Sequence, residues 1–146
     1  MNKVLFKKLN ERAICPSYGT PSSAGADLYV LDEGTTTIKS GETVMLHTGI
    51  AVVIPEGYVG LIFARSGLAS KKGLAPANKV GVIDSDYRGE IMVPLHNHTS
   101  QDKTIECGER FAQMVIVPYL KADFVETDTL DETERGVSGF GSTGTK

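Results

Sequence analysis

Short runs of β-branched, aromatic and other apolar residues alternate with turn signals along most of this chain. Six runs have the length of single strands: Thr35 to Lys39, Val44 to Ile54, Tyr58 to Phe63, Val80 to Ile83, Ile91 to Leu95, and Phe111 to Tyr119. Turn signals such as Ser40-Gly41 and Cys107-Gly108 separate them. Helical spacing is confined to residues 66–72, which would make at most about two turns. The pattern predicts an all-β domain, a barrel or sandwich of short strands.

The pattern changes near residue 130. The last segment has glycines at 136, 139, 141 and 144 and few large apolar side chains, so burial cannot offset its ordering entropy. We therefore predict a β-rich catalytic domain over 1–130 and a glycine-rich tail over 131–146. The tail is either disordered or a flap in which Arg135 and Phe140 close over an anionic, aromatic ligand.

Composition and charge narrow the class of protein. The 146 residues are 40% hydrophobic and 23% charged, which fits one globular domain. No apolar run approaches the roughly 18 residues of a membrane span, and the first residues lack the apolar centre of a signal peptide, so we expect a cytoplasmic protein. In that compartment Cys15 and Cys107 are expected to be free, partly buried thiols. A net charge of −3 argues against non-specific binding to long nucleic acids, but not against a small phosphorylated ligand.

The stretch GVIDSDYRGE, residues 81–90, places acidic and aromatic side chains on one tight turn. Apolar runs on both sides predict a hairpin, whose strands would hold Asp84, Asp86 and Tyr87 rigidly. A rigid carboxylate is what a hydrolase needs to aim a water molecule. A solvated turn is the alternative, and on these residues alone it is the favoured interpretation, because Asp, Ser and Gly are ordinary turn formers.

The segment ARSGLAS, residues 64–70, predicts an anion site. Arg65 offers a planar donor fork, Ser66 a hydroxyl, and the amides of Gly67 and Leu68 would point out of a helix start. A helix capped by Ser66 is the alternative, and it is compatible with anion binding because both use the same backbone amides.

The spacing of His96 and His98 would place both rings on one face of a strand. No nearby Cys or His completes a tetrahedral set, so we do not expect a metal there. His47 stands alone in a strand-like run, and nothing pairs a particular Ser with a particular His as in a hydrolase triad.

Five separated strings resemble, in order, the five motifs of the trimeric deoxyuridine triphosphate nucleotidohydrolases (dUTPases). They are AGADL at 24–28, ARSGLA at 64–69, NKVGVIDSDYRGEI at 78–91, GERFAQ at 108–113 and RGVSGFGSTG at 135–144. The resemblance covers essentially the whole chain. It implies a jelly-roll-like, β-clip subunit in a homotrimer, with each active site built from three subunits, and magnesium-assisted hydrolysis of dUTP to dUMP and pyrophosphate.

The resemblance also implies roles for individual residues around the base, sugar and reacting phosphorus. Asp84 would hold and activate the water that attacks the α-phosphorus, and Tyr87 would lie under the deoxyribose, where a ribose 2′-hydroxyl would collide with it. Uracil would be read by Asn78 and by the backbone around Gly81, Val82, Ile83 and Met92.

On the phosphate side, the residues implied are Arg65, Ser66, Gly67 and Gln113. Asp27 would contact the water shell of a Mg²⁺ bound mainly to the triphosphate, which suits an ion that keeps its waters. Without the resemblance, Asp27 is more simply a turn carboxylate and Gln113 a polar residue at a strand edge. In the tail, Arg135 would reach the γ-phosphate and Phe140 would stack on uracil, with Gly141 and Ser142 beside the ligand.

Three residues depart from the family pattern: Ser138 replaces a glycine, Ala64 a proline, and Ala26 a larger residue. Ser138 would cost about 1 kcal/mol if its position required a positive φ. Two rival functions remain. The first is a dCTP deaminase of the same fold, which would need a catalytic glutamate where Pro94 stands. The second is a catalytically idle nucleotide-sensing or protein-binding module.

Overall fold

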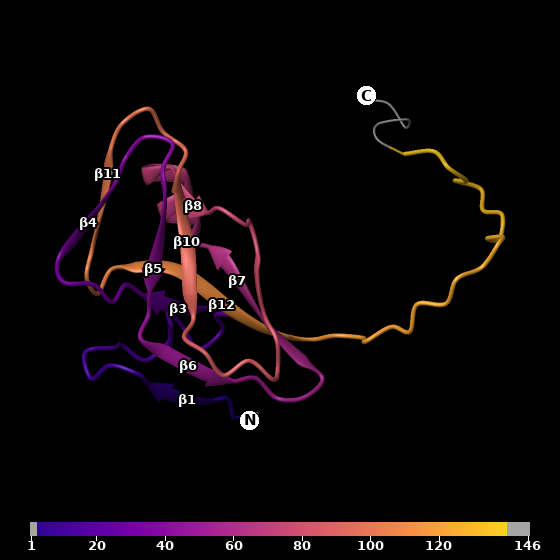
Figure 1. Ribbon diagram of the computed structural model, residues 1–146, viewed down its shortest axis with the longest axis horizontal. Helices are drawn as coiled ribbons and strands as arrows, with labels where there is room; N and C mark the ends of the chain where they lie inside the picture. The colour runs from indigo at the N-terminus through magenta and orange to yellow at the C-terminus, as the bar shows by residue number, and fades with distance from the viewer. Residues whose placement is uncertain (1–2, 140–146) are drawn as a thin grey trace.

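The computed structural model describes residues 3–139, and short antiparallel strands account for most of their regular structure (Figure 1). These residues form twelve strands and one helical turn: β1 Leu5–Lys8, β2 Ser17–Tyr18, β3 Ala26–Tyr29, β4 Thr35–Ile38, β5 Thr43–His47, β6 Ile50–Val53, β7 Tyr58–Ala64, η1 Leu68–Lys72, β8 Leu74–Pro76, β9 Gly81–Ile83, β10 Met92–Asn97, β11 Lys103–Glu106 and β12 Arg110–Pro118. The all-β prediction is confirmed. The helical turn has five residues, too few to span a bilayer.

The strands form four small sheets around one apolar core. The largest has the order β2-β3-β12-β7-β9, the next is β5-β10-β8, and the pairs β1-β6 and β4-β11 complete the body. Alternation along β10 turns Val93, Leu95 and Asn97 inward, where they are buried, while the residues between them face outward. Phe111 on β12 is fully buried, so the strand at the centre of the largest sheet is anchored in the core.

All six predicted runs contain strands, but the run from Val44 to Ile54 forms two. Gly49, with φ of +65°, turns the chain between β5 and β6. The strands β1, β2, β3, β8 and β11 were missed, since they are short or, like β11, carry charged residues at both ends. Cys15 and Cys107 are unpaired as expected, but they are exposed rather than partly buried.

The prediction of a hairpin at residues 81–90 is wrong. Strand β9 pairs with β7, where Gly81 lies opposite Ile62, whereas β10 pairs with β5 and β8. The local turn does form, since the Tyr87 amide donates to the Asp84 carbonyl at 3.2 Å. Residues 84–91 therefore connect two different sheets, and no hydrogen bonds between β9 and β10 hold the ends of this loop together.

The helical segment has the predicted position but not the predicted cap. Its backbone is already helical at Gly67, it continues as a single π-helical turn, and no side-chain hydrogen bond caps its start. The Ser66 carbonyl instead accepts a hydrogen bond from the Ser70 hydroxyl at 2.7 Å. The prediction that Ser66 is the N-cap is therefore wrong.

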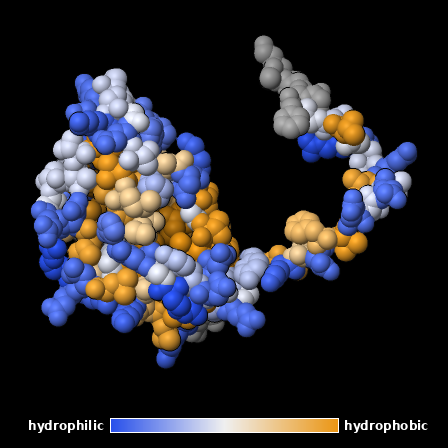
Figure 2. Space-filling view, viewed as in Figure 1, coloured by the Kyte–Doolittle hydropathy of each residue, from blue (hydrophilic) through white to orange (hydrophobic). Residues whose placement is uncertain are grey.

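The chain leaves the body after β12. Within the described part, the Tyr119 amide makes the last backbone hydrogen bond to the body, at 3.1 Å from the Gly57 carbonyl, and residues 120–139 then run away from it (Figure 1). Apolar side chains lie exposed along this segment, among them Leu120 and Phe124 (Figure 2). The division at residue 130 stays a prediction, although the last strand already ends at Pro118.

Candidate active site

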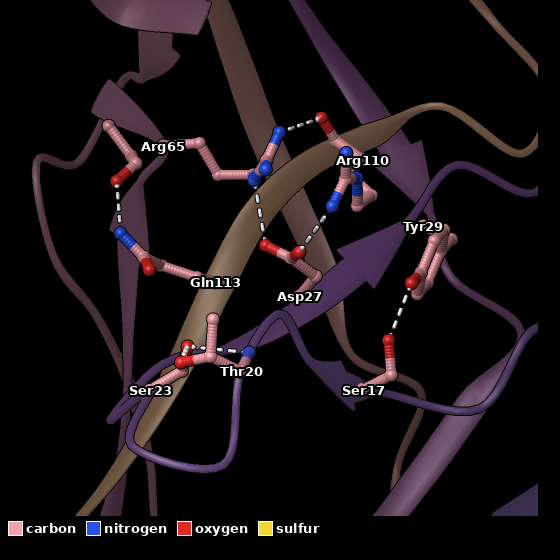
Figure 3. A network of polar contacts seen from close by, with 9 residues as sticks. Ser17, Thr20, Ser23, Asp27, Tyr29, Arg65, Arg110 and Gln113 are labelled. Carbon is pink, nitrogen blue, oxygen red and sulfur yellow. Dashed lines mark hydrogen bonds and ion pairs between the residues drawn. The ribbon is translucent and has the colours of Figure 1, made fainter. Parts of the chain in front are cut away.

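Two arginines converge on one buried carboxylate beside the central strand of the largest sheet (Figure 3). Asp27 on β3 is 7% exposed, and its two oxygens accept hydrogen bonds from Arg65 Nε at 2.7 Å and Arg110 Nη1 at 3.2 Å. Burying a carboxylate without a partner would be costly, so this pairing accounts for its position. Asp27 consequently fixes the orientation of both guanidinium groups.

The register of β12 explains why these residues meet. Gln113 lies opposite Asp27 on one side and Phe63 on the other, and Arg65 follows β7 directly. Gln113 Nε2 donates to the Ala64 carbonyl at 2.9 Å. A Cβ on Gly25 would overlap Gln113 Oε1, so the glycine of AGADL leaves room for the Gln113 side chain. Three of the five strings therefore meet in space.

These residues line a cleft of about 640 Å³. Its walls include Asp27, Arg65, Ser66, Gly67, Arg110 and Gln113. Two guanidinium groups face one carboxylate, so the cleft carries surplus positive charge suited to an anion with several oxygens. Arg110 was not predicted; its position in GERFAQ, three residues before Gln113 on the same strand, was the available signal.

A second, smaller hollow of about 190 Å³ surrounds the turn that follows β9. It is lined by Met45, Val82, Ile83, Asp84, Tyr87, Glu90 and Met92. The structure thus brings together five of the predicted residues and adds Met45 and Glu90. Met45 was missed because it comes from β5, a distant segment that lies beside β10. Asp86 does not line this hollow, in keeping with its interpretation as a turn residue.

The Tyr87 ring presents a flat, partly exposed surface in this hollow, with 41% of the residue accessible. The ring lies across Gly89, where an added Cβ would overlap its hydroxyl end. The hydroxyl donates to the Glu90 carbonyl at 3.0 Å. The Asp84 carboxylate is exposed beside it.

Asn78 and Gly81 lie at the other end of β9. Gly81 packs against Ile62, and a Cβ on Gly81 would lie 3.6 Å from Asn78 Nδ2, so the Asn78 amide lies beside the start of the strand. The turn before β9 contains Lys79 with φ of +65°, the one non-glycine residue with positive φ between residues 3 and 139.

The cleft and the hollow are far apart in one chain. Ile83 pairs with Gly60 on β7, and Arg65, the first residue after β7, lies five residues beyond Gly60, a distance of about 16 Å at about 3.3 Å per residue. The Asp84 and Arg65 groups of a single subunit therefore do not face one another.

Of the tail residues, the structure describes Arg135 and Ser138, while Phe140, Gly141 and Ser142 lie outside the described residues. Arg135 Nε donates to the Ser138 carbonyl at 3.2 Å. Ser138 does not have a positive φ in the extended tail, and the cost of a positive φ in a closed flap stays a prediction.

The part of the chain that the structure describes has no group of three or more His, Cys, Asp or Glu able to hold a metal ion. The centroids of the His96 and His98 rings lie 4.4 Å apart, and the rings pack edge to face. His96 Nδ1 is 2.9 Å from the Thr43 hydroxyl. His47 pairs with Glu90 at 3.0 Å.

The fold and the two hollows define an all-β protein whose arginine-lined cleft suits a phosphorylated small molecule. The model of the dUTPase family matches residues 11–144. The chain therefore belongs to the dUTPase family.

Sequence relatives agree over the full length. The chain is 51% identical over 144 residues to the deoxyuridine 5'-triphosphate nucleotidohydrolase of Hydrogenobaculum sp. (strain Y04AAS1), covering 99% of each chain. It is 48% identical to that of Desulfitobacterium hafniense (strain DSM 10664 / DCB-2), covering 97% of this chain and 95% of the relative.

Solved structures show the same fold. The Staphylococcus bacteriophage 80alpha dUTPase with dUPNHPP superimposes with a TM-score of 0.91 at 30% identity, covering 99% of this chain and all of the other. A dUTPase variant from phage phi11 of S. aureus, whose structure reveals the coordination of a structural Mg(II) ion, gives 0.80 at 27% identity over 88% and 98% of the two chains. The jelly-roll-like class expected from the resemblance is confirmed.

Proposed function

We propose that this chain hydrolyses dUTP to dUMP and pyrophosphate. The observation that carries the proposal is the meeting of three separated motifs in the arginine-lined cleft, on a chain that matches the family from residue 11 to residue 144. An anion with several oxygens fits that cleft. The relatives at 48% and 51% identity are named for the same activity.

Asp84 is the proposed general base. Its exposed carboxylate follows a strand end and accepts a proton from the water that attacks the α-phosphorus. The new bond joins the water oxygen to the α-phosphorus, and the bond that breaks releases pyrophosphate. Tyr87 lies under the deoxyribose, where its ring excludes a 2′-hydroxyl. Base recognition falls to Asn78, Met92 and the backbone of Gly81, Val82 and Ile83.

The arginine-lined cleft is proposed to hold the triphosphate. Arg65, Ser66, Gly67 and Gln113 supply donors, and Arg110 joins them because Asp27 holds both guanidinium groups in place. Phosphoryl transfer requires positioning and charge neutralisation more than a strong base, and fixed guanidinium groups provide both. Arg135, Phe140, Gly141 and Ser142 of the tail are proposed to cover the nucleotide.

Magnesium is proposed as the cofactor. Each Asp27 oxygen accepts one hydrogen bond from an arginine and keeps a further lone pair, which would meet, through water, an ion that the substrate phosphates hold. When bound, Mg²⁺ neutralises phosphate charge and orients the leaving pyrophosphate. The protein's own share is to hold the Asp27 carboxylate in one place through Arg65 and Arg110.

A homotrimer is the proposed assembly. Because Arg65 lies about 16 Å beyond Gly60, the partner of Ile83, the cleft of one subunit needs the hollow of another to complete a site. Contacts of this head-to-tail kind close into a ring when the rotation allows, and a three-membered ring gives three equal sites.

A substrate panel tests the function. The chain is incubated with dUTP, dTTP, dCTP and UTP in the presence of Mg²⁺, and pyrophosphate, monophosphate and ammonia are measured together. We expect pyrophosphate and dUMP from dUTP, at a rate well above that for the other three. Ammonia from dCTP would identify a deaminase, and nucleotide binding without turnover would identify a sensing module; either result contradicts the proposal.

The role of Asp84 is tested in the same assay. Asp84→Asn is expected to lower kcat about 10²- to 10⁴-fold, since general-base catalysis contributes that much, while dUPNHPP still binds. Asp86→Asn is the matched control, because Asp86 belongs to the same turn but does not line the hollow. A variant at Asp84 that keeps more than about a tenth of the wild-type rate would remove the general-base role.

A further inference from the structure

One side chain fastens the loop after β9 to a corner of a different sheet. Glu90 Oε1 accepts a hydrogen bond from the Gly49 amide at 2.7 Å, and its Oε2 lies 3.0 Å from His47 Nδ1. Gly49 is the positive-φ turn between β5 and β6, and His47 is the last residue of β5. The Glu90 side chain is 22% exposed and its bond to the Gly49 amide is partly buried, whereas the His47 side chain at the other oxygen is 53% exposed.

The same residue holds the sugar-side ring through its backbone. The Glu90 carbonyl accepts the Tyr87 hydroxyl at 3.0 Å. The next residue is also fixed: the Ile91 amide donates to the Ile50 carbonyl at 2.8 Å, and the Thr48 hydroxyl donates to the Ile91 carbonyl at 2.7 Å. The acceptor of the Tyr87 hydroxyl is therefore tied to the corner at residues 47–50.

Other side-chain contacts of the loop do not attach it to the corner at residues 47–50. Arg88 donates to the carbonyls of Ser85 and Tyr87, at 2.7 and 2.8 Å, and both lie within the loop. Within residues 3–139, the side-chain hydrogen bonds that join loop 84–90 to another segment are those of Glu90. Because β9 and β10 do not pair, these bonds supply the restraint that a hairpin would otherwise provide.

We infer that Glu90 is a positioning residue for the sugar pocket, which sets the Tyr87 ring against the deoxyribose and thereby governs discrimination between dUTP and UTP. The inference rests on the proposed function. Glu90 is also the residue shared by the hollow at Asp84 and Tyr87 and a hollow of about 330 Å³ around Arg12, Asp32 and His47. Glu90 therefore contributes to the wall of both hollows.

Two substitutions of Glu90 separate position from charge. Glu90→Gln keeps an oxygen acceptor for the Gly49 amide and offers an amide donor to His47 Nδ1. Glu90→Ala removes both contacts and leaves the Gly49 amide without its acceptor, which releases the loop exit. Glu56→Ala is the surface control, since Glu56 is exposed in the turn between β6 and β7.

The measurement is kcat/KM for dUTP and for UTP with each variant. We expect Glu90→Ala to narrow the dUTP to UTP ratio by about tenfold or more, since a displaced ring no longer excludes the 2′-hydroxyl. For Glu90→Gln we expect a dUTP to UTP ratio within about threefold of wild type, because the hydrogen bonds remain and only one charge is lost. Equal losses on both substrates with Glu90→Ala would show a general structural role and overturn the inference.

Tyr87→Phe removes the same hydrogen bond from its other end and leaves the Glu90 side chain intact. It should narrow the ratio too, and the double variant with Glu90→Ala should narrow it no further, because both act through one contact. Additive effects, or an unchanged ratio in Tyr87→Phe, would overturn the inference, and this variant decides the matter if Glu90→Ala does not fold. If the wild-type chain does not hydrolyse dUTP, the proposed function is refuted instead. The inference is then tested by calorimetry, in which Glu90→Ala and Tyr87→Phe should narrow the ratio of the affinities for dUMP and UMP.

Discussion

At the scale of single residues, Asp27 shows how a buried charge can prepare a surface for an anion. Its carboxylate takes one hydrogen bond from each of two arginines, so their remaining donors are already oriented when a phosphate arrives. Lysines in their place would be point charges on flexible stems. The two guanidinium groups of the cleft are therefore already ordered before an anion binds, which lowers the entropy cost of binding.

The Glu90 carboxyl makes stability depend on pH. Burial alone would raise the pKa of Glu90, but the hydrogen bonds from His47 and the Gly49 amide outweigh burial and lower it below its ordinary value. A carboxyl whose pKa is lower in the folded state stabilises the fold above its unfolded pKa, and this contribution disappears as the pH falls through the folded pKa.

We therefore expect the free energy of unfolding of the wild type to exceed that of Glu90→Gln at about pH 6, and the difference to shrink toward about pH 3. Urea unfolding at a series of pH values measures both. A difference that stays constant or widens on acidification would contradict the lowered pKa of Glu90.

At the scale of elements, the sequence predicted strands better than it predicted their partners. Alternation and β-branched runs located β4, β7, β9 and β12, because burial of one face leaves a local signal. Pairing leaves no such signal: Val80 to Ile83 would suit either β7 or β10, and the choice depends on contacts across the whole sheet.

The same limit applies to the candidate site. Motif strings supplied Arg65, Asp84 and Tyr87, whereas Met45 comes to the hollow through the position of β5, which no local pattern reveals. Glu90 stood within a recognised string, but its contacts with His47 and Gly49 depend on the same position of β5. Arg110 stood within a recognised string, but its role follows from Asp27 lying opposite Gln113 across two strands.

The corner at Gly49 is the element on which several contacts depend. Gly49 has φ of +65°, and an added Cβ would overlap Leu31 and lie 2.9 Å from the Ala13 Cβ. We expect Gly49→Ala to lower the free energy of unfolding by about 3 kcal/mol, from left-handed strain together with overpacking.

Gly41→Ala is the matched control for this corner. Gly41 has φ of +73°, but a Cβ there meets nothing within 4 Å, so strain acts alone and the cost should be about 1 kcal/mol. Thermal or urea unfolding of both variants provides the comparison. Equal destabilisation would show that packing at the corner adds nothing.

At the scale of the whole molecule, the distance between cleft and hollow supports the proposed trimer, in which neither feature is a complete site by itself. In the proposed trimer, each site takes Asp84 from one chain and Arg65 from another. An Asp84→Asn chain and an Arg65→Ala chain, each nearly inactive by itself, should then complement one another.

Mixing the two variants in equal amounts by refolding tests this arrangement. Random assembly places an intact Asp84 beside an intact Arg65 in about a quarter of the sites, so we expect about a quarter of the wild-type rate. If both groups came from the same chain, no mixed site would be intact, and the mixture would stay as inactive as its components.

The contacts around Asp27 also have a consequence for the order in which the molecule is made. Arg65 and Arg110 lie 38 and 83 residues from Asp27 along the chain, so these contacts close only after large loops have formed. On the ribosome, the cleft can assemble only after β12 has emerged and joined β3 and β7. In the proposed trimer, nucleotide added during synthesis would then stabilise finished and assembled chains and leave every shorter nascent chain unprotected.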